Sequence, residues 1–234
     1  MVDRKVLIGV PTGEYARRAD FYDYYNLLSK PVGTMAMFVH GPSPAKNRNQ
    51  IIDQAIEHKC SHVLFIDDDS AFKSDALIQL LEHDKDIVCG LQLRREYPHQ
   101  PLIFDHMKSD GQSLYSYLNG DETRLKRIAA CGFGFVLIKT TVFEKMEKPW
   151  VRIGELDPQE WSDDIGFFKR AREAGVTEMY CDMECRIGHI STMVVWPNKV
   201  DGKWYTGYDT RGDEGMLNTP QIMPAIQQTG VKNG

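Results

Sequence analysis

No long apolar run occurs in this chain of 234 residues. A helix that crosses a bilayer needs roughly 18 or more consecutive apolar residues, and no stretch approaches that length. The first six residues, Met-Val-Asp-Arg-Lys-Val, also lack the long apolar segment of a secretion signal. We therefore expect no membrane span and a cytoplasmic location.

An excess of basic charge is absent as well. Lysine and arginine number 28 against 33 aspartates and glutamates, so the formal net charge is −5. This balance gives no support to wholesale nucleic-acid binding, although a local basic patch can still hold a nucleic-acid substrate. The hydrophobic share of 42% supplies a sizeable core, and the length suits one generous domain or a domain with an appendage.

Nothing in the cysteine pattern indicates a disulfide framework. The chain has five cysteines, an odd number, and they lie in apolar surroundings that predict reduced core thiols. Cys181, Cys185 and His189 are evenly spaced, and zinc binding is the alternative interpretation. Their spacing fits no familiar zinc module, and a fourth ligand is not evident.

A glycine-rich, basic loop is missing after the first expected strand, at residues 5–10. Such a loop is typical of nucleotidyltransferases, and Pro11-Thr12-Gly13-Glu14 matches it poorly. An enzyme that makes a nucleotide-sugar therefore stays an alternative with this feature against it. The loop still brings backbone close to any ligand beyond the strand end.

The most informative stretch that is present is Val63–Ser70, in which four apolar residues run into three aspartates. The apolar run predicts a strand buried on both faces, as in a parallel sheet. Asp67, Asp68 and Asp69 would then lie in the crevice beyond the strand end, where such sheets bind ligands. Adjacent carboxylates become favourable when a hard divalent cation takes their oxygens. The alternative is a solvated acidic turn that caps the next helix.

Strands and helices alternate through the first half of the chain. We expect strands at residues 5–10, 34–39, 63–66 and 86–91, and helices at 15–28, 45–58 and, with Ser74 as N-cap, to 83. This order predicts an α/β fold with a doubly wound, Rossmann-like, mostly parallel sheet and helices on both faces.

The pattern changes after Leu93. Short strands and one long strand at residues 127–139, with two glycines, predict a smaller mixed or antiparallel part. Two short strands follow at 178–182 and 185–190. The turn-rich end predicts a division into a catalytic domain at residues 1–192 and an extension at 193–234 that wraps the domain or covers its cleft.

Two helix starts carry charge that suits a binding site. Arg48 lies in the first turns of the helix at 45–58, where a cation is tolerated if an anion binds nearby; a solvated charge is the alternative. Ser162 is a good N-cap for a helix that opens with Asp163 and Asp164 and closes at Gly175.

Taken in order, these features resemble the GT-A fold glycosyltransferases. The strand into Asp67-Asp68-Asp69 resembles their DxD motif, and Asp163-Asp164 resembles their ED helix start, with Asp163 where the family usually shows Glu. His189, just after a strand, resembles their late metal-site histidine. The resemblance covers about residues 4 to 190 and is closest to family 2-like enzymes, including compact phage and viral forms, for which the location would be the host cytoplasm.

The resemblance implies a metal-dependent glycosyltransferase that uses a UDP- or GDP-sugar. Asp69 and His189, with or without Asp67, would hold Mn²⁺ or Mg²⁺, and a histidine among oxygen ligands leans toward Mn²⁺. Asp67 or Asp68 would instead contact the ribose if it is not a ligand. A core histidine with satisfied hydrogen bonds is the alternative for His189.

The resemblance also implies which residues border the nucleotide. Pro11, Thr12 and Arg48 would lie beside it, and Arg94 or Arg95 would help to hold the diphosphate. The alternative for the arginine pair is a surface loop without a ligand.

On the acceptor side, Asp164 would be the general base and Asp163 would bind acceptor hydroxyls, with inversion at the anomeric carbon. The acceptor is left open among a glycan, a lipid-linked sugar, a protein and a modified nucleic-acid base. A non-catalytic sugar-binding relative is a further alternative, against which the retained acids argue.

Overall fold

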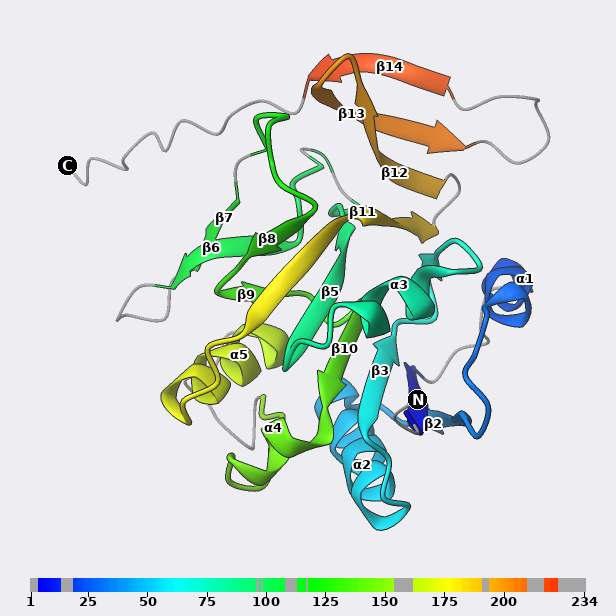
Figure 1. Ribbon diagram of the computed structural model, residues 1–234. Helices are drawn as coiled ribbons and strands as arrows, with labels where there is room; N and C mark the ends of the chain where they lie inside the picture. Colours follow the sequence, from blue (N-terminus) through cyan, green and yellow to red (C-terminus); the bar gives the residue numbers. More distant parts are fainter. Residues whose placement is uncertain are drawn as a thin grey trace.

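The computed structural model describes residues 4–13, 19–95, 97, 99–107, 113–116, 118–153, 162–190, 194–209 and 217–222. These residues form a large mixed sheet, a small three-stranded sheet and five helices (Figure 1). The expected residues 15–18 of the first helix, and the chain after 222, lie outside the described residues. No helix in the described ranges is long and apolar enough to cross a membrane.

The centre of the large sheet consists of five parallel strands and one strand of opposite direction. The strands are β1 (Val6–Thr12), β2 (Met35–His40), β3 (His62–Ile66), β5 (Ile87–Gln92), β10 (Phe135–Lys139) and β11 (Met179–Ile190). β1 pairs in parallel with β2 and β3, and β5 pairs in parallel with β11. β10 lies between β3 and β5 and is antiparallel to both. The predicted α/β sheet is thus confirmed, and its one reversed strand makes it mixed.

Helices cover both faces of this sheet. They are α1 (Ala19–Leu27), α2 (Pro44–Glu57), α3 (Ala76–Glu82), α4 (Thr140–Glu144) and α5 (Asp163–Glu173). Alternate side chains of β3 enter two apolar clusters, with α2, α4 and α5 on one face and α1 and α3 on the other. All five residues of β3 are buried, as its apolar sequence predicts. Asp75, not the predicted Ser74, is the N-cap of α3, and its side chain makes no capping hydrogen bond.

The prediction of one long strand at residues 127–139 is wrong. The chain there forms β8 (Leu125–Arg127), β9 (Ala130–Cys131) and β10. β9 pairs with β6 (Ile103–Met107), which also pairs with β7 (Ser113–Tyr115), and these three make the small sheet. The break falls at residues 132–134, where two glycines let the backbone leave one sheet and enter the other.

The two strands expected at 178–182 and 185–190 are one strand, β11, with an irregularity between Asp182 and Arg186. Asp182 is fully buried at this point and is bonded to His83 (2.7 Å) and to Arg124 (3.1 Å). The Asp182 carboxylate is thus held by two side chains at the point where the regular pairing is interrupted.

The part of the predicted turn-rich end that the structure describes is largely strand. β12 (Val194–Val200), β13 (Lys203–Asp209) and β14 (Leu217–Ile222) pair in antiparallel order and continue the sheet from β11, at the top of Figure 1. Trp204 on β13 is buried, and its indole N–H donates to Glu122 (2.9 Å). The division at residue 192 stays a prediction.

Candidate active site

The turn that carries the three aspartates is fixed by Gly134, just before β10. The Gly134 carbonyl accepts hydrogen bonds from the Asp67 amide (3.1 Å) and from the Ser70 hydroxyl (2.9 Å). Ser70 Oγ in turn accepts from Gln92 Nε2 (3.3 Å), and both side chains are buried. A Cβ on Gly134 would lie 2.0 Å from Gln92 Oε1, so this arrangement requires glycine.

A cavity of about 320 Å³ lies beyond the carboxyl ends of β1 and β3. This is the edge at which the sequence predicts a ligand. Seven of the predicted site residues line it: Pro11, Thr12, Arg48, Asp67, Asp68, Asp69 and Asp163. The predicted site residues Arg94, Asp164 and His189 are not among the described residues that line it.

Arg48 connects the two halves of the cavity. One terminal nitrogen donates to Asp67 Oδ1 (2.8 Å) and the other donates to Asp163 Oδ2. The side chain is 7% exposed, and its guanidinium lies 4.5 Å from the centre of the Phe133 ring. Burial alone would lower the pKa of Arg48, but the surrounding carboxylates outweigh it and raise the pKa. Its Nε is buried without a partner in the described part of the chain.

Asn47 is a site residue that the sequence did not indicate. Its buried side-chain amide donates to three backbone carbonyls, those of Thr12 (3.2 Å), Val39 (3.3 Å) and Gly41 (3.2 Å). These bonds hold the loops after β1 and β2 against the first turn of α2. A Cβ on Gly41 would lie 2.5 Å from Asn47 Oδ1, which explains glycine at that position. The available sequence signal was an amide side chain directly before Arg48, in the first turn of the same helix.

Asp164 lies at the start of α5, as predicted. Ser162 is the N-cap and accepts from the Ile165 amide (3.2 Å). Asp164 Oδ1 accepts from the Ser162 hydroxyl and from the Ile165 amide (2.7 Å). Asp164 Oδ2 faces Gly132, where a Cβ would lie 3.9 Å from it. Burial raises the pKa of Asp164, and the hydrogen bond from Ser162 only partly opposes this.

Asp69 and His189 are brought together from distant parts of the sequence. His189 pairs with Ser70 where β11 meets β4 (Ser70–Ala71), and its Nε2 lies 3.8 Å from Asp69 Oδ1. Its Nδ1 donates to the Leu93 carbonyl (2.6 Å), because a carbonyl can only accept. In the neutral ring Nε2 then carries the lone pair that faces Asp69.

Of the two predicted arginines, Arg95 contacts the aspartate turn. Its Nη1 lies 3.0 Å from Asp69 Oδ2, and its side chain is 43% exposed. The Arg94 backbone is held by Gln100 and His99 at the start of the same loop. The role of either arginine at a diphosphate stays a prediction.

Of the three side chains predicted to bind a metal, two lie close enough to each other to share a divalent cation. Among the described residues, no group of three or more His, Cys, Asp and Glu side chains is arranged to hold a metal ion. Asp67 turns to Arg48, which leaves Asp69 and His189 of the predicted set. Ligand distances of about 2.1 Å allow two donors up to roughly 4.2 Å apart to share one ion, and substrate phosphates commonly complete such sites. The pair therefore fits a cation held jointly with a diphosphate.

The cysteines give no sign of the alternative zinc site. All five are buried and free. Cys181, Cys185 and His189 form no cluster that the described part of the chain would offer to zinc.

The chain matches no protein-family model, and no curated protein is significantly similar to it in sequence. Among solved structures, A197 from STIV has a TM-score of 0.58 and 15% identity, over 96% of this chain and 99% of that one. TarS residues 1–349 from S. aureus give a TM-score of 0.43 and 13% identity, over 76% of this chain and 57% of that one. The likeness to A197 shows a shared fold, in agreement with the GT-A-like α/β architecture expected from the sequence.

Proposed function

We propose that this protein is a metal-dependent glycosyltransferase that moves a sugar from a UDP- or GDP-sugar to an acceptor hydroxyl. The observation that carries the proposal is the contact of Arg48 with both Asp67 and Asp163. It joins the aspartate turn after β3 to the acidic start of α5, so the two predicted halves of a transferase site face one cavity. The GT-A-like fold supports the same conclusion.

On the donor side, Pro11 and Thr12 border the nucleotide. Asp69 and His189 would hold Mn²⁺ or Mg²⁺, which when bound supplies positive charge to the diphosphate leaving group. Arg95 lies beside Asp69 and adds a guanidinium that can pair with the same phosphate oxygens. Asp67, already held by Arg48, is oriented toward the ribose rather than the ion.

On the acceptor side, Asp164 is the general base. Its Oδ2 accepts the proton of the acceptor hydroxyl while the hydroxyl oxygen attacks the anomeric carbon. The bond from that carbon to the diphosphate oxygen breaks with its electron pair, so direct displacement inverts the anomeric centre. A raised pKa makes this carboxylate a stronger base than an exposed aspartate. Asp163 orients the acceptor, and Arg48 orients Asp163.

Calorimetry with UDP and GDP, with and without Mn²⁺, tests the donor site. We expect binding that depends on the metal and that weakens about tenfold or more in Asp69→Asn and His189→Ala, because each removes a charged or coordinating partner. Asp53→Asn, on the exposed side of α2, is the matched control and should bind normally. Nucleotide binding that ignores the metal in every variant would contradict the proposal.

A screen of nucleotide-sugars for Mn²⁺-dependent hydrolysis then identifies the donor without an acceptor. Release of diphosphate from a nucleoside triphosphate and a sugar phosphate would instead indicate a nucleotidyltransferase.

A further inference from the structure

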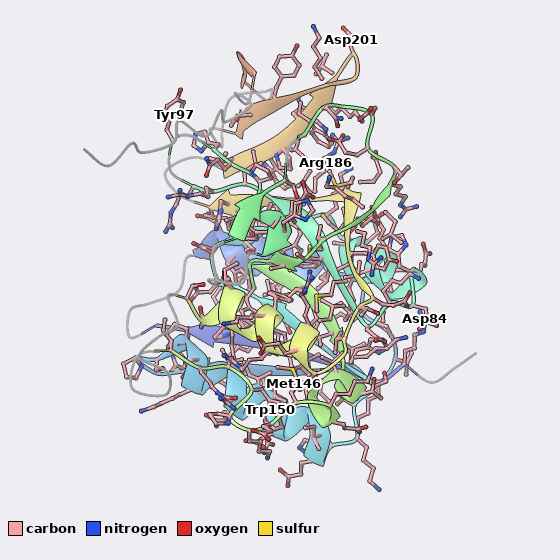
Figure 2. All side chains as sticks on the ribbon, turned by 90° about the vertical axis from the view of Figure 1, so that its left-hand side faces the viewer. Asp84, Tyr97, Met146, Trp150, Arg186 and Asp201 are labelled. Atoms are coloured by element: carbon pink, nitrogen blue, oxygen red, sulfur yellow. The ribbon has the colours of Figure 1, made fainter. Side chains whose placement is uncertain are left out.

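A second pocket, of about 510 Å³, lies between α5 and the strands β6 and β8. Figure 2 looks onto this side of the molecule, with the yellow-green α5 below the green strands, and Figure 1 shows the same order at its left. Asp105 and His106 come from β6, Arg127 from β8, and Arg172 from the last turn of α5. None of the predicted site residues lines it.

The charge of this pocket is basic although the whole protein is acidic. Asp105 is already paired with Lys126 (3.2 Å) and accepts from the Ser116 hydroxyl (2.8 Å), so it does not neutralise the arginines. Arg127 uses one nitrogen to donate to the Thr177 carbonyl (3.3 Å), which fixes its guanidinium at the pocket wall. The Arg172 side chain makes no hydrogen bond or ion pair with any residue that the structure describes, although its backbone carbonyl accepts from the Gly175 amide (2.9 Å).

The pocket shares both of its walls with the surroundings of Asp164. Asp164 and Arg172 stand eight residues apart on α5, which corresponds to about 12 Å along the helix. On the other wall, the Gly132 amide donates to the Leu102 carbonyl (3.0 Å) beside Asp164, and β6 runs from there to Asp105. The arginines therefore lie beside the same helix and the same strands as Asp164, about 12 Å further along α5.

We propose that this pocket binds a phosphate or carboxylate group of the acceptor, at about 12 Å from the hydroxyl that is glycosylated. The assignment of the ligand as the acceptor rests on the proposed function. The anion-binding site itself rests on Arg127 and Arg172. Two guanidiniums, one from each wall of the pocket, recognise an oxyanion through several charge-assisted hydrogen bonds. The volume lies in the range of small-molecule sites and suits a sugar-sized unit.

Titration with inorganic phosphate, glucuronate and neutral glucose, followed by NMR of backbone amides and arginine side chains, tests the site without donor or metal. We expect both anions to shift Ile128, Thr177 and the two arginines, and glucose not to. In Arg127→Gln/Arg172→Gln the affinity should fall by about tenfold or more. Lys59→Gln/Lys148→Gln removes the same charge from exposed positions elsewhere and should bind as the unchanged protein does.

Equal binding of the anions by both double variants, or no binding by the unchanged protein, would overturn the site. A screen of acceptors completes the test: acceptors with a phosphate or carboxylate should be preferred about tenfold over neutral ones, and the arginine variant should lose that preference. Equal use of charged and neutral acceptors would overturn the assignment to the acceptor. Loss of metal-dependent UDP or GDP binding would concern the donor proposal alone.

Discussion

Arg48 shows how one residue satisfies conflicting demands. Its guanidinium is nearly excluded from water, which is unfavourable for a charge, yet two carboxylates and the face of Phe133 surround it. Lysine carries the same charge but offers a single ammonium in place of a planar fork. The geometry therefore depends on arginine and not only on positive charge at this position.

Arg48→Lys should lower the free energy of unfolding by about 1–3 kcal/mol, because Asp67 or Asp163 is left without its hydrogen bond. Urea unfolding measures this. Lys46→Gln, an exposed change in the same helix turn, should have little effect. A double-mutant cycle of Arg48→Met with Asp163→Asn should give a coupling of about 0.5–3 kcal/mol. Additive effects would mean that the two side chains do not interact.

If Asp164 is the general base, as proposed, Asp164→Asn should lower the transfer rate by roughly 10²–10⁴-fold, with donor binding kept. In the unchanged protein the rate should then fall as the pH drops through the raised pKa of Asp164, since the carboxylate becomes protonated. Initial rates across pH measure this. A variant that transfers sugar at the normal rate would exclude Asp164 as the base.

The same raised pKa has a defined effect on stability. The folded protein binds the Asp164 proton more tightly than the unfolded chain does, so stability decreases as the pH rises from the unfolded pKa toward the folded one. The Asp164→Asn protein lacks this titrating carboxyl. The difference in melting temperature between the variant and the unchanged protein should therefore shift in favour of the variant as the pH rises from the unfolded pKa to the folded pKa of Asp164, and should then stay constant. An unchanged difference at every pH would contradict the raised pKa.

At the scale of elements, local signals predicted α2, β3 and α5 within a residue or two. Ser162 and the acids after it specify the start of α5, and the apolar run of β3 needs no distant partner to be recognised. Between β9 and β10, Gly132 and Gly134 indicate a bend, but no local signal places the two strands in different sheets. This separation follows from their pairing with β6 and with β3 and β5, which lie far away in the sequence.

For the site as well, local sequence predicted individual residues but not the contacts that they make with distant parts of the chain. The motif order predicted most of the residues that line the cavity, but their partners come from elsewhere. Arg48 meets Asp163 across more than a hundred positions, and Asp69 meets His189 across a similar span. Neither contact, nor the turn of Asp67 away from the predicted cation, follows from spacing along the chain.

Gly134→Ala tests the element that holds the aspartate turn. The new Cβ would displace Gln92, and with it the Ser70 hydroxyl, so we expect a loss of about 1–3 kcal/mol in unfolding free energy and weaker metal-dependent nucleotide binding. Gly132→Ala is the control for stability, since its Cβ would meet no atom closer than 3.7 Å. Equal stability of the two variants would argue against the steric requirement.

For the molecule as a whole, the strands after residue 193 share a core with the rest. Trp204 belongs to the apolar cluster that also contains α2 and α5, so β13 is tied to the central sheet. The turn-rich sequence predicted an extension that wraps the domain or covers its cleft and did not indicate these strands, because edge strands of a sheet have no helical or motif signal of their own.

Trp204→Ala should destabilise the whole protein by about 3–5 kcal/mol in a single cooperative transition. Trp204→Phe keeps the ring but loses the bond to Glu122, and should cost less. Val200→Ala, at a side chain that is 42% exposed, is the control. Calorimetry that shows a separate small transition for the Trp204→Ala protein would favour an independent C-terminal domain.

The reversed strand β10 also sets the order in which this chain can fold. Residues 135–139 pair with residues 62–66 and 87–89, so β3 and β5 have no shared partner until the later segment has left the ribosome. Until that segment has emerged, each of these two apolar strands has an unpaired backbone edge. Such edges promote association with other chains. We expect slow folding that is limited by the insertion of β10, and a nascent chain that depends on chaperones during that interval.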